Sequence, residues 1–70
     1  MSEGISILVN GEPRTVAAGG NVTALLQTLG IPEGRVAIER NLEILPRSAW
    51  LTTIVAAGDR FEIVHFVGGG

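Results

Sequence analysis

The residues best placed to carry chemistry stand at the end of the sequence, in the run Phe66-Val67-Gly68-Gly69-Gly70. Glycine loses more backbone entropy on ordering than any other residue and has no side chain to pack, so three glycines make a poor end for a folded element. We therefore expect residues 66–70 to form a flexible, extended tail with its α-carboxylate on Gly70. Gly68 and Gly69 let such a tail thread into a narrow channel and bring the carboxylate to a reaction centre on a partner.

The alternative is an inert, frayed terminus, because chain ends are often poorly ordered. The preceding residues favour a reactive tail, since residues 60–67 read as a strand that runs into the glycines without a linker. We expect Gly70 to be the reacting residue and Gly68 and Gly69 to be the threading segment.

Composition excludes several other chemistries. The 70 residues include no cysteine, which rules out disulfides, thiolate metal ligands and thiol nucleophiles. The one histidine, His65, cannot form a zinc site alone, and its apolar neighbours on a strand favour a packed or edge residue. We therefore expect no bound metal and no bound cofactor.

Charge and hydropathy bear on the partners. The formal net charge is −2 and the five arginines form no cluster, which argues against a nucleic acid partner. No apolar run approaches the length that spans a membrane, and residues 1–4 do not resemble a signal peptide. We expect no membrane partner and a cytoplasmic location.

The first half of the sequence predicts a hairpin and a helix. Residues 5–9 and 12–17 read as strands joined by Asn10-Gly11, a strong hairpin signal because both residues tolerate positive φ. Asn21 suits a helix N-cap and Gly30 the position just after a helix. Between them lies an apolar stripe with the spacing of one helix face, formed by Val22, Leu25, Leu26 and Leu29.

The second half predicts three more strands, at residues 35–39, 42–45 and 60–67. Asn41 falls in the turn between the first two, and Pro46 ends the second. Residues 47–50 form a single helical turn in this prediction, with Trp50 as a core anchor. Asp59 is expected to shape the turn before the last strand.

These elements predict an α+β domain of the β-grasp type over residues 1–65, followed by the tail at residues 66–70. One amphipathic helix must cover one face of a mixed β-sheet. The right-handed crossover rule places the last strand parallel to the first and in the centre of the sheet. The core beneath the helix stripe is then expected to contain Ile5, Ile7, Val9, Phe61 and Ile63.

Strand alternation puts Leu8, Val64 and Phe66 on the other face of the sheet, and we expect them to gather near the tail. A cluster of exposed apolar residues on one face marks an interaction surface. Together with Val67, these residues are expected to bind a partner protein. A contact between two copies of the chain is the alternative.

Three stretches of the sequence together resemble a known family. They are residues 5–11, the run Ala37-Ile38-Glu39-Arg40-Asn41 leading to Leu45-Pro46-Arg47 and Trp50, and the ending from Gly58-Asp59 to the glycines. The pattern resembles the thiamine-biosynthesis sulfur-carrier proteins, which are ubiquitin-like β-grasp proteins, over nearly the whole chain. Arg40 and Leu42 depart from the family pattern, in which small or polar residues are more usual around the asparagine.

The resemblance implies a mechanism in which the chain is a protein cosubstrate and not an enzyme. An E1-like adenylyltransferase uses ATP to adenylate the Gly70 carboxylate. Sulfur from a sulfur-donating enzyme then replaces one carboxylate oxygen and gives a thiocarboxylate. Thiazole synthase consumes this thiocarboxylate when it forms the thiazole ring of thiamine.

Three other functions remain open from the sequence. The small subunit of molybdopterin synthase shares the fold and the tail, although the Pro46-Arg47 and Trp50 segment and the short length favour the thiamine branch. A ubiquitin-like protein modifier would attach its tail to lysines of other proteins. This chain has no lysine for polymers of itself, but single attachment remains open. The third alternative is an interaction domain with an inert tail.

Overall fold

The helix predicted from the apolar stripe is present in the computed structural model, which describes residues 4–66. Helix α1 (Val22–Leu29) begins at Asn21, whose extended backbone ends the preceding loop and whose side chain accepts a hydrogen bond of 2.8 Å from the Ala24 amide. It ends at Gly30, which has a φ of 73°. That left-handed conformation suits glycine, because glycine has no Cβ to clash. Both predicted caps are therefore confirmed.

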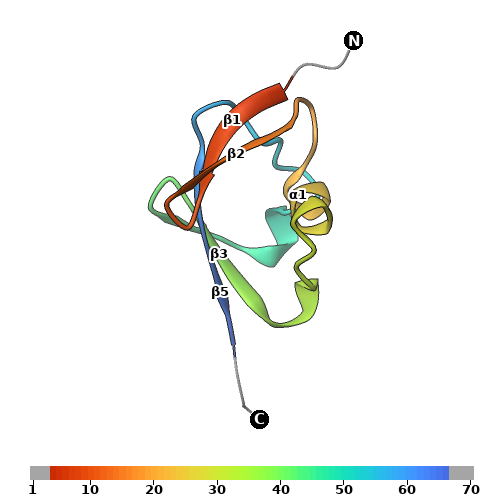
Figure 1. Cartoon of the computed structure of the whole chain (residues 1–70). Coiled ribbons are helices and arrows are strands. Elements are labelled where there is room, and N and C mark those ends of the chain that lie inside the picture. The colour runs from red at the N-terminus through yellow and green to blue at the C-terminus, as the bar shows by residue number, and fades with distance from the viewer. Residues whose placement is uncertain (1–3, 67–70) are drawn as a thin grey trace.

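Five strands form one mixed sheet, in the order β2-β1-β5-β3-β4 (Figure 1). The strands are β1 (Gly4–Val9), β2 (Glu12–Ala17), β3 (Val36–Arg40), β4 (Glu43–Leu45) and β5 (Arg60–His65). Strands β1 and β5 run parallel, whereas the other neighbours are antiparallel. The predicted α+β fold, with the last strand central and parallel to the first, is confirmed.

Several strand boundaries differ from the prediction by one or two residues. Strand β1 begins one residue earlier and β3 lies one residue later along the chain than predicted. The fourth strand begins at Glu43 and not at Leu42, because Asn41 and Leu42 have φ values of 53° and 73° and form the turn after β3. The last strand ends at His65, although the Phe66 amide still donates a hydrogen bond of 2.8 Å to the Arg35 carbonyl. Short 3₁₀ helices precede β3 and follow β4, at η1 (Glu33–Arg35) and η2 (Arg47–Ala49).

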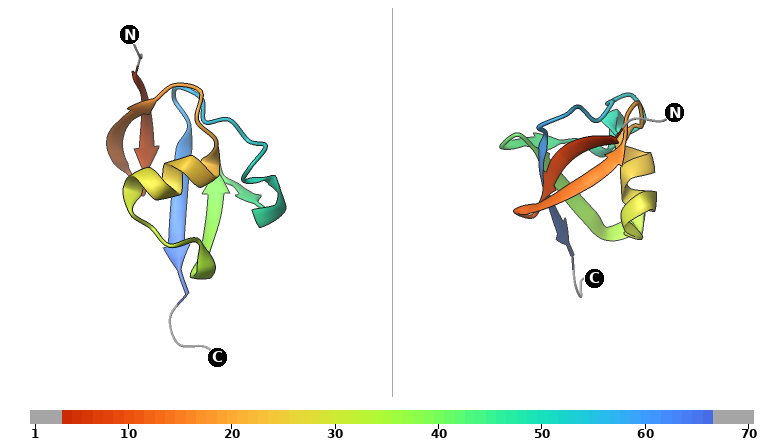
Figure 2. Two further views of the ribbon diagram at one scale, coloured as in Figure 1. Left: turned by 90° about the vertical axis from the view of Figure 1, so that its right-hand side faces the viewer. Right: turned by 45° about the horizontal axis from the view of Figure 1, so that its top comes forward.

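The core lies between α1 and one face of the sheet, which the helix crosses in Figure 2. Burial removes its apolar side chains from water, which is the main favourable term in folding. Ile5 and Leu29 pack at its margin and stay partly exposed. The buried residues are Ile7, Val9, Val22, Leu25, Leu26, Val36, Ile38, Trp50, Val55, Phe61 and Ile63.

Trp50 anchors the segment between β4 and β5 in this core, as predicted. Its ring is 2% exposed, and its Nε1 donates a hydrogen bond of 3.1 Å to the Leu45 carbonyl. The Arg47 guanidinium lies 4.5 Å from the centre of the ring and donates a hydrogen bond of 2.7 Å to the Glu33 carbonyl. Arg47 therefore ties η2 to η1.

Among residues 4–66, no helix combines the length and the apolar character that crossing a bilayer would require. The same part of the chain contains no group of three or more His, Cys, Asp or Glu residues arranged to hold a metal ion.

Candidate functional site

The site begins where β5 leaves the sheet. Strand β5 pairs with β3 over five residue pairs, from Arg40↔Phe61 to Val36↔His65, but with β1 only at Leu8↔Arg60 and Val9↔Phe61. The end of β5 therefore extends past the end of β1 and away from the body of the domain (Figure 1). This arrangement places Phe66 at one end of the described part of the molecule.

The side chain of Asn10 continues the pairing after β1 has ended. Its Oδ1 accepts a hydrogen bond of 2.7 Å from the Ile63 amide, and its Nδ2 donates one of 3.3 Å to the Ile63 carbonyl. The side-chain amide thus takes the place of one more backbone residue of β1. The sequence assigned Asn10 only to the hairpin turn, and nothing in the local pattern reveals its contact with a residue 53 positions away.

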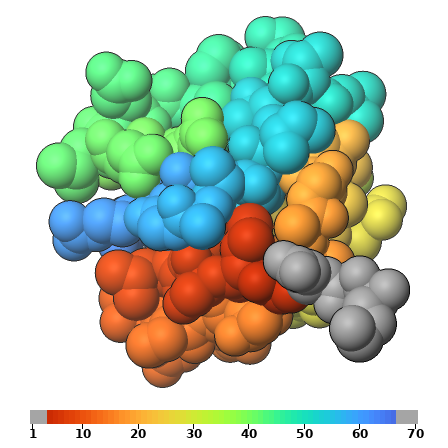
Figure 3. All heavy atoms as spheres, turned by 90° about the horizontal axis from the view of Figure 1, so that it is seen from above, coloured from red at the N-terminus to blue at the C-terminus, as the bar shows by residue number. Residues whose placement is uncertain are grey.

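At the opposite end of β5, where the strand begins, other parts of the chain cover the sheet. Viewed from the end away from the C-terminus, the segment leading into β5 covers the sheet between β1 and the β3–β4 hairpin (Figure 3). Asp59 fixes this segment, since its carboxylate accepts hydrogen bonds from Arg40 Nε at 3.0 Å, Asn41 Nδ2 at 3.1 Å and the Ala56 amide at 2.9 Å. Asp59 therefore shapes the turn before β5, as predicted.

Burial and hydrogen bonding act in opposite directions on Asp59, which is 5% exposed. Burial alone raises its pKa, because it penalises the charged form. The hydrogen bonds from the Ala56 amide, Asn41 and Arg40, together with the charge of Arg40, outweigh burial and lower the pKa of Asp59 below its ordinary value. In its charged form, the carboxylate therefore stabilises the end of the domain where β5 begins.

The face of the sheet that α1 does not cover, called the open face below, carries the predicted binding residues within the described chain. Val64 and Phe66 are each 57% exposed, and Val64 lies directly opposite Ala37 of β3. Ile44 of β4 is 70% exposed and lies opposite Glu39 on this face. The exposed apolar residues of this region are therefore Ile44, Val64 and Phe66, with the half-buried Ala37 between them.

One part of this prediction is wrong. Leu8 shares the open face, but it lies opposite Arg60, at the start of β5, and not near Val64 and Phe66. The register is set by hydrogen bonds from the Leu8 amide to the Asp59 carbonyl and from the Asn10 amide to the Phe61 carbonyl. Four residues of an extended strand separate Arg60 from Val64, which is about 13 Å.

Sequence reasoning missed Ile44 as part of this surface. A signal was present, because a two-residue turn at Asn41-Leu42 makes Ile44 the partner of Glu39. Since Ile38 is buried, Glu39 and its partner must face the other way. The missed step was the exact position of the turn.

The remaining predicted site residues are Val67, Gly68, Gly69 and Gly70, which lie outside the described residues. Their roles stay predictions. His65 is exposed and lies opposite Val36, next to the end of β5.

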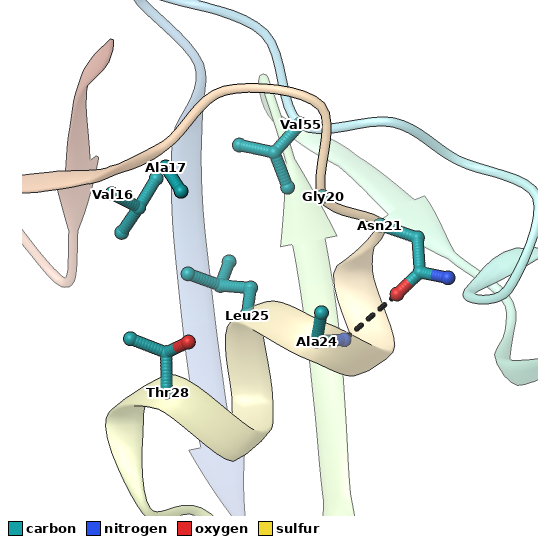
Figure 4. A pocket seen from close by; sticks show the side chains of 8 residues that line it. All are labelled: Val16, Ala17, Gly20, Asn21, Ala24, Leu25, Thr28 and Val55. Atoms are coloured by element: carbon teal, nitrogen blue, oxygen red, sulfur yellow. Dashed lines mark hydrogen bonds between the residues drawn. The ribbon is translucent and has the colours of Figure 1, made fainter. Parts of the chain in front are cut away.

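A small hollow of about 70 Å³ lies elsewhere, between the end of β2, helix α1 and the loop before β5 (Figure 4). Its lining is mainly apolar, and the Asn21 side chain at its margin is engaged in capping the helix. It belongs to the helix-covered side of the sheet and not to the open face. Its lining residues are Val16, Ala17, Gly20, Asn21, Ala24, Leu25, Thr28 and Val55.

Comparisons with known proteins agree on one family. The sequence model of the ThiS family matches residues 7–70. The chain is 33% identical over 66 residues to the sulfur carrier protein ThiS of Escherichia coli, and the match covers 94% of this chain and 100% of that protein. A crystal structure of the thiamine biosynthesis protein ThiS from Geobacter metallireducens matches with a TM-score of 0.78 and 40% identity, over 94% of this chain and 100% of that one.

A second kind of relative is longer. The chain is 47% identical over 66 residues to a thiazole synthase from Paramagnetospirillum magneticum, a match that covers 94% of this chain. A thiazole synthase from Magnetococcus marinus matches at 38% identity. The chain spans 20% of the length of each of these two proteins.

Proposed function

The chain belongs to the ThiS family of sulfur carriers in thiamine biosynthesis, which are small carrier proteins and not catalysts, and on this premise we propose that its Gly70 carboxyl is the group that carries sulfur. In this proposal the carboxylate is first adenylated and then converted to a thiocarboxylate. The thiocarboxylate donates its sulfur to thiazole formation.

The observation that supports this proposal is the way β5 is held. The strand lies between β1 and β3, and the Asn10 side chain extends its pairing as far as Ile63. On its other side, hydrogen bonding continues to the Phe66 amide. The strand is thus held on both sides close to Phe66, which stands four residues before Gly70 in the sequence.

Activation is needed because a carboxylate is a poor electrophile at neutral pH. In the proposed first step, the Gly70 carboxylate attacks the α-phosphorus of ATP, and pyrophosphate leaves. The resulting acyl adenylate has AMP as a good leaving group. Sulfide supplied by the sulfur-donating enzyme then attacks the acyl carbon, the bond between that carbon and the AMP oxygen breaks, and AMP leaves with the thiocarboxylate remaining on Gly70.

The carrier itself supplies no acid, base or metal to these steps in the proposal. An E1-like adenylyltransferase binds ATP and performs the activation. Thiazole synthase receives the sulfur, an assignment supported by the relatives in which a segment similar to this chain makes up part of a protein named thiazole synthase. The carrier contributes a docking surface and a reachable carboxyl.

The test is the intact mass of the protein after incubation with ATP, the E1-like enzyme and a sulfur source. We expect the mass to rise by the exchange of one oxygen for one sulfur, with the change located in the last peptide. Incubation without ATP is the control. Sulfur incorporated at any other residue, or no sulfur incorporated with the physiological enzymes, would contradict the proposal.

A further inference from the structure

Two glutamates of the open face stand directly opposite each other. Glu39 of β3 pairs with Glu62 of β5, and both point away from the core because their neighbours Ile38 and Ile63 are buried. Directly opposite side chains of an antiparallel pair have Cβ atoms about 4.5–5.5 Å apart, a separation at which like charges destabilise the sheet.

Within residues 4–66, neither glutamate of this pair takes part in an ion pair. The ion pairs of the described chain join Arg14 to Glu12 and Arg40 to Asp59, and neither glutamate of the pair takes part in them. Arg60 shares the open face, two residues before Glu62, but lies opposite Asn41 and forms no ion pair with Glu39 or Glu62. The two carboxylates therefore stand opposite each other, and within the described residues neither of them forms an ion pair.

The side of the pair that faces the end of β5 is apolar. In the next row towards the end of β5 lie Ala37 and Val64, and beside Glu39 on β4 lies Ile44. Phe66 follows two positions after Val64, where its amide bonds to the Arg35 carbonyl, and it is exposed. A partner that covers these side chains would remove Glu39 and Glu62 from water, and buried charges are tolerated only when they are paired.

We propose that Glu39 and Glu62 together bind one arginine or lysine side chain of the thiazole synthase when the open face docks on that enzyme. This inference rests on the proposed function. The cation would lie between the two carboxylates, and its positive charge would offset the repulsion between them. The apolar residues around it would exclude water and strengthen the charge interaction.

A second copy of this chain does not fit the surface. In a symmetric dimer the same patch would come from both copies, so four carboxylates would meet in one interface. The thiazole synthase is favoured as the partner because, in two relatives, a segment similar to this chain is part of the same polypeptide as the synthase.

The experiment measures binding of the unactivated carrier to the thiazole synthase of the same organism by titration calorimetry. Glu39→Gln and Glu62→Gln should each weaken binding about tenfold, because each removes one of two charges around the cation. The double variant should lose less than the product of the two single effects, since both act on the same cation. Glu12→Gln, which makes the same chemical change on the distant edge strand β2, should bind like the wild type.

A second measurement separates docking from folding. Urea unfolding of the free carrier should show that Glu62→Gln is at least as stable as the wild type, because it relieves the repulsion from Glu39. Binding of the wild type should also weaken as salt is raised, and binding of the double variant should weaken less.

The inference would be overturned if Glu39→Gln and Glu62→Gln both bound the thiazole synthase with wild-type affinity. It would also be overturned if the two variants bound only the E1-like enzyme more weakly. Formation of a dimer by the wild type through this face would also overturn it. The proposed function is judged separately in the same preparations, by whether the carrier gains sulfur at its last peptide. A carrier that gains sulfur while Glu39→Gln and Glu62→Gln bind normally refutes the charge pairing and leaves the sulfur-carrier function intact.

Discussion

Asn41 donates a hydrogen bond of 3.1 Å to the carboxylate of Asp59, and so joins the turn after β3 to the turn before β5. The same Asn41 side chain accepts a hydrogen bond of 2.9 Å from the Arg60 amide. The Asn41 backbone amide donates another of 2.8 Å to the Arg60 carbonyl. One residue therefore fixes the start of the strand that leads to the functional end of the chain.

Replacing Asp59 with alanine should destabilise the fold by about 2–3 kcal/mol. The change leaves Arg40, the Asn41 side chain and the Ala56 amide without their acceptor in a largely buried site, and each unsatisfied group carries a desolvation cost. Urea unfolding followed by circular dichroism measures the loss. A loss below about 0.5 kcal/mol would show that water replaces the carboxylate without cost.

The stability of the domain should fall with acid in a way that depends on Asp59. Its pKa is lowered in the folded state, so the unfolded chain binds a proton at higher pH than the folded chain does. Asp59 therefore makes its full contribution to the free energy of unfolding at pH values above its unfolded pKa of about 3.9. This contribution is lost as the pH falls through the lower pKa of the folded state. Unfolding free energies measured from pH 6 to pH 2 should decline less steeply for Asp59→Asn than for the wild type.

Replacing Leu42 with glycine should stabilise the fold by about 0.5–1 kcal/mol. Leu42 has a φ of 73°, a conformation that costs an L-residue with a side chain roughly 1–2 kcal/mol and costs glycine none of that strain. Its side chain is 78% exposed, so little packing is lost. The matched control is Leu51→Gly, at an exposed leucine without positive φ, which should be neutral or slightly destabilising.

Phe66→Ala should weaken binding to the E1-like enzyme about tenfold or more without lowering the melting temperature. The ring is 57% exposed on the open face, and the loss of an apolar anchor near the centre of an interface costs about 2 kcal/mol. Leu8→Ala should have the smaller effect on binding, because Leu8 lies at the other end of β5. Equal affinity of Phe66→Ala and the wild type in titration calorimetry would remove Phe66 from the docking surface.

One residue added after Gly70 should block adenylation. The extension replaces the reacting acid with an amide and moves the free carboxylate by about 3.3–3.6 Å, more than a reaction centre tolerates. Gly69→Val should slow adenylation severely, because its Cβ and methyl groups would obstruct a narrow channel. Pyrophosphate exchange with the E1-like enzyme is the measurement, and the melting temperature of both variants should stay unchanged. Exchange at the wild-type rate by the extended protein would favour an inert terminus.

The sequence predicted the elements whose signals are local. Asn10-Gly11, the Asn21 cap and the stripe from Val22 to Leu29 each act within one turn of chain, and all three were correct. The register of β1 against β5 was not predictable in this way, because it depends on hydrogen bonds between residues about 50 positions apart. Leu8 was therefore placed at the wrong end of the open face.

The surface was harder to predict than the core for the same reason. Burial follows from apolar alternation along each strand, so Ile7, Phe61 and Ile63 were correctly placed beneath the helix. The grouping of Glu39, Glu62 and Ile44 depends on how three strands are aligned, and that alignment follows from a turn that uses Leu42 where glycine is expected. The residue pattern along a single strand does not show how that strand is aligned with its neighbours.

The central place of β5 also has a consequence for synthesis of the protein. Strand β5 leaves the ribosome after the other four described strands, and it is the strand that joins β1 to β3 in the sheet. Until residues 60–65 emerge, the nascent chain holds two unpaired strand edges and lacks Phe61 and Ile63 from its core, so it cannot complete its cooperative fold. A chain whose translation stops before residue 60 should therefore stay unfolded and be open to proteolysis.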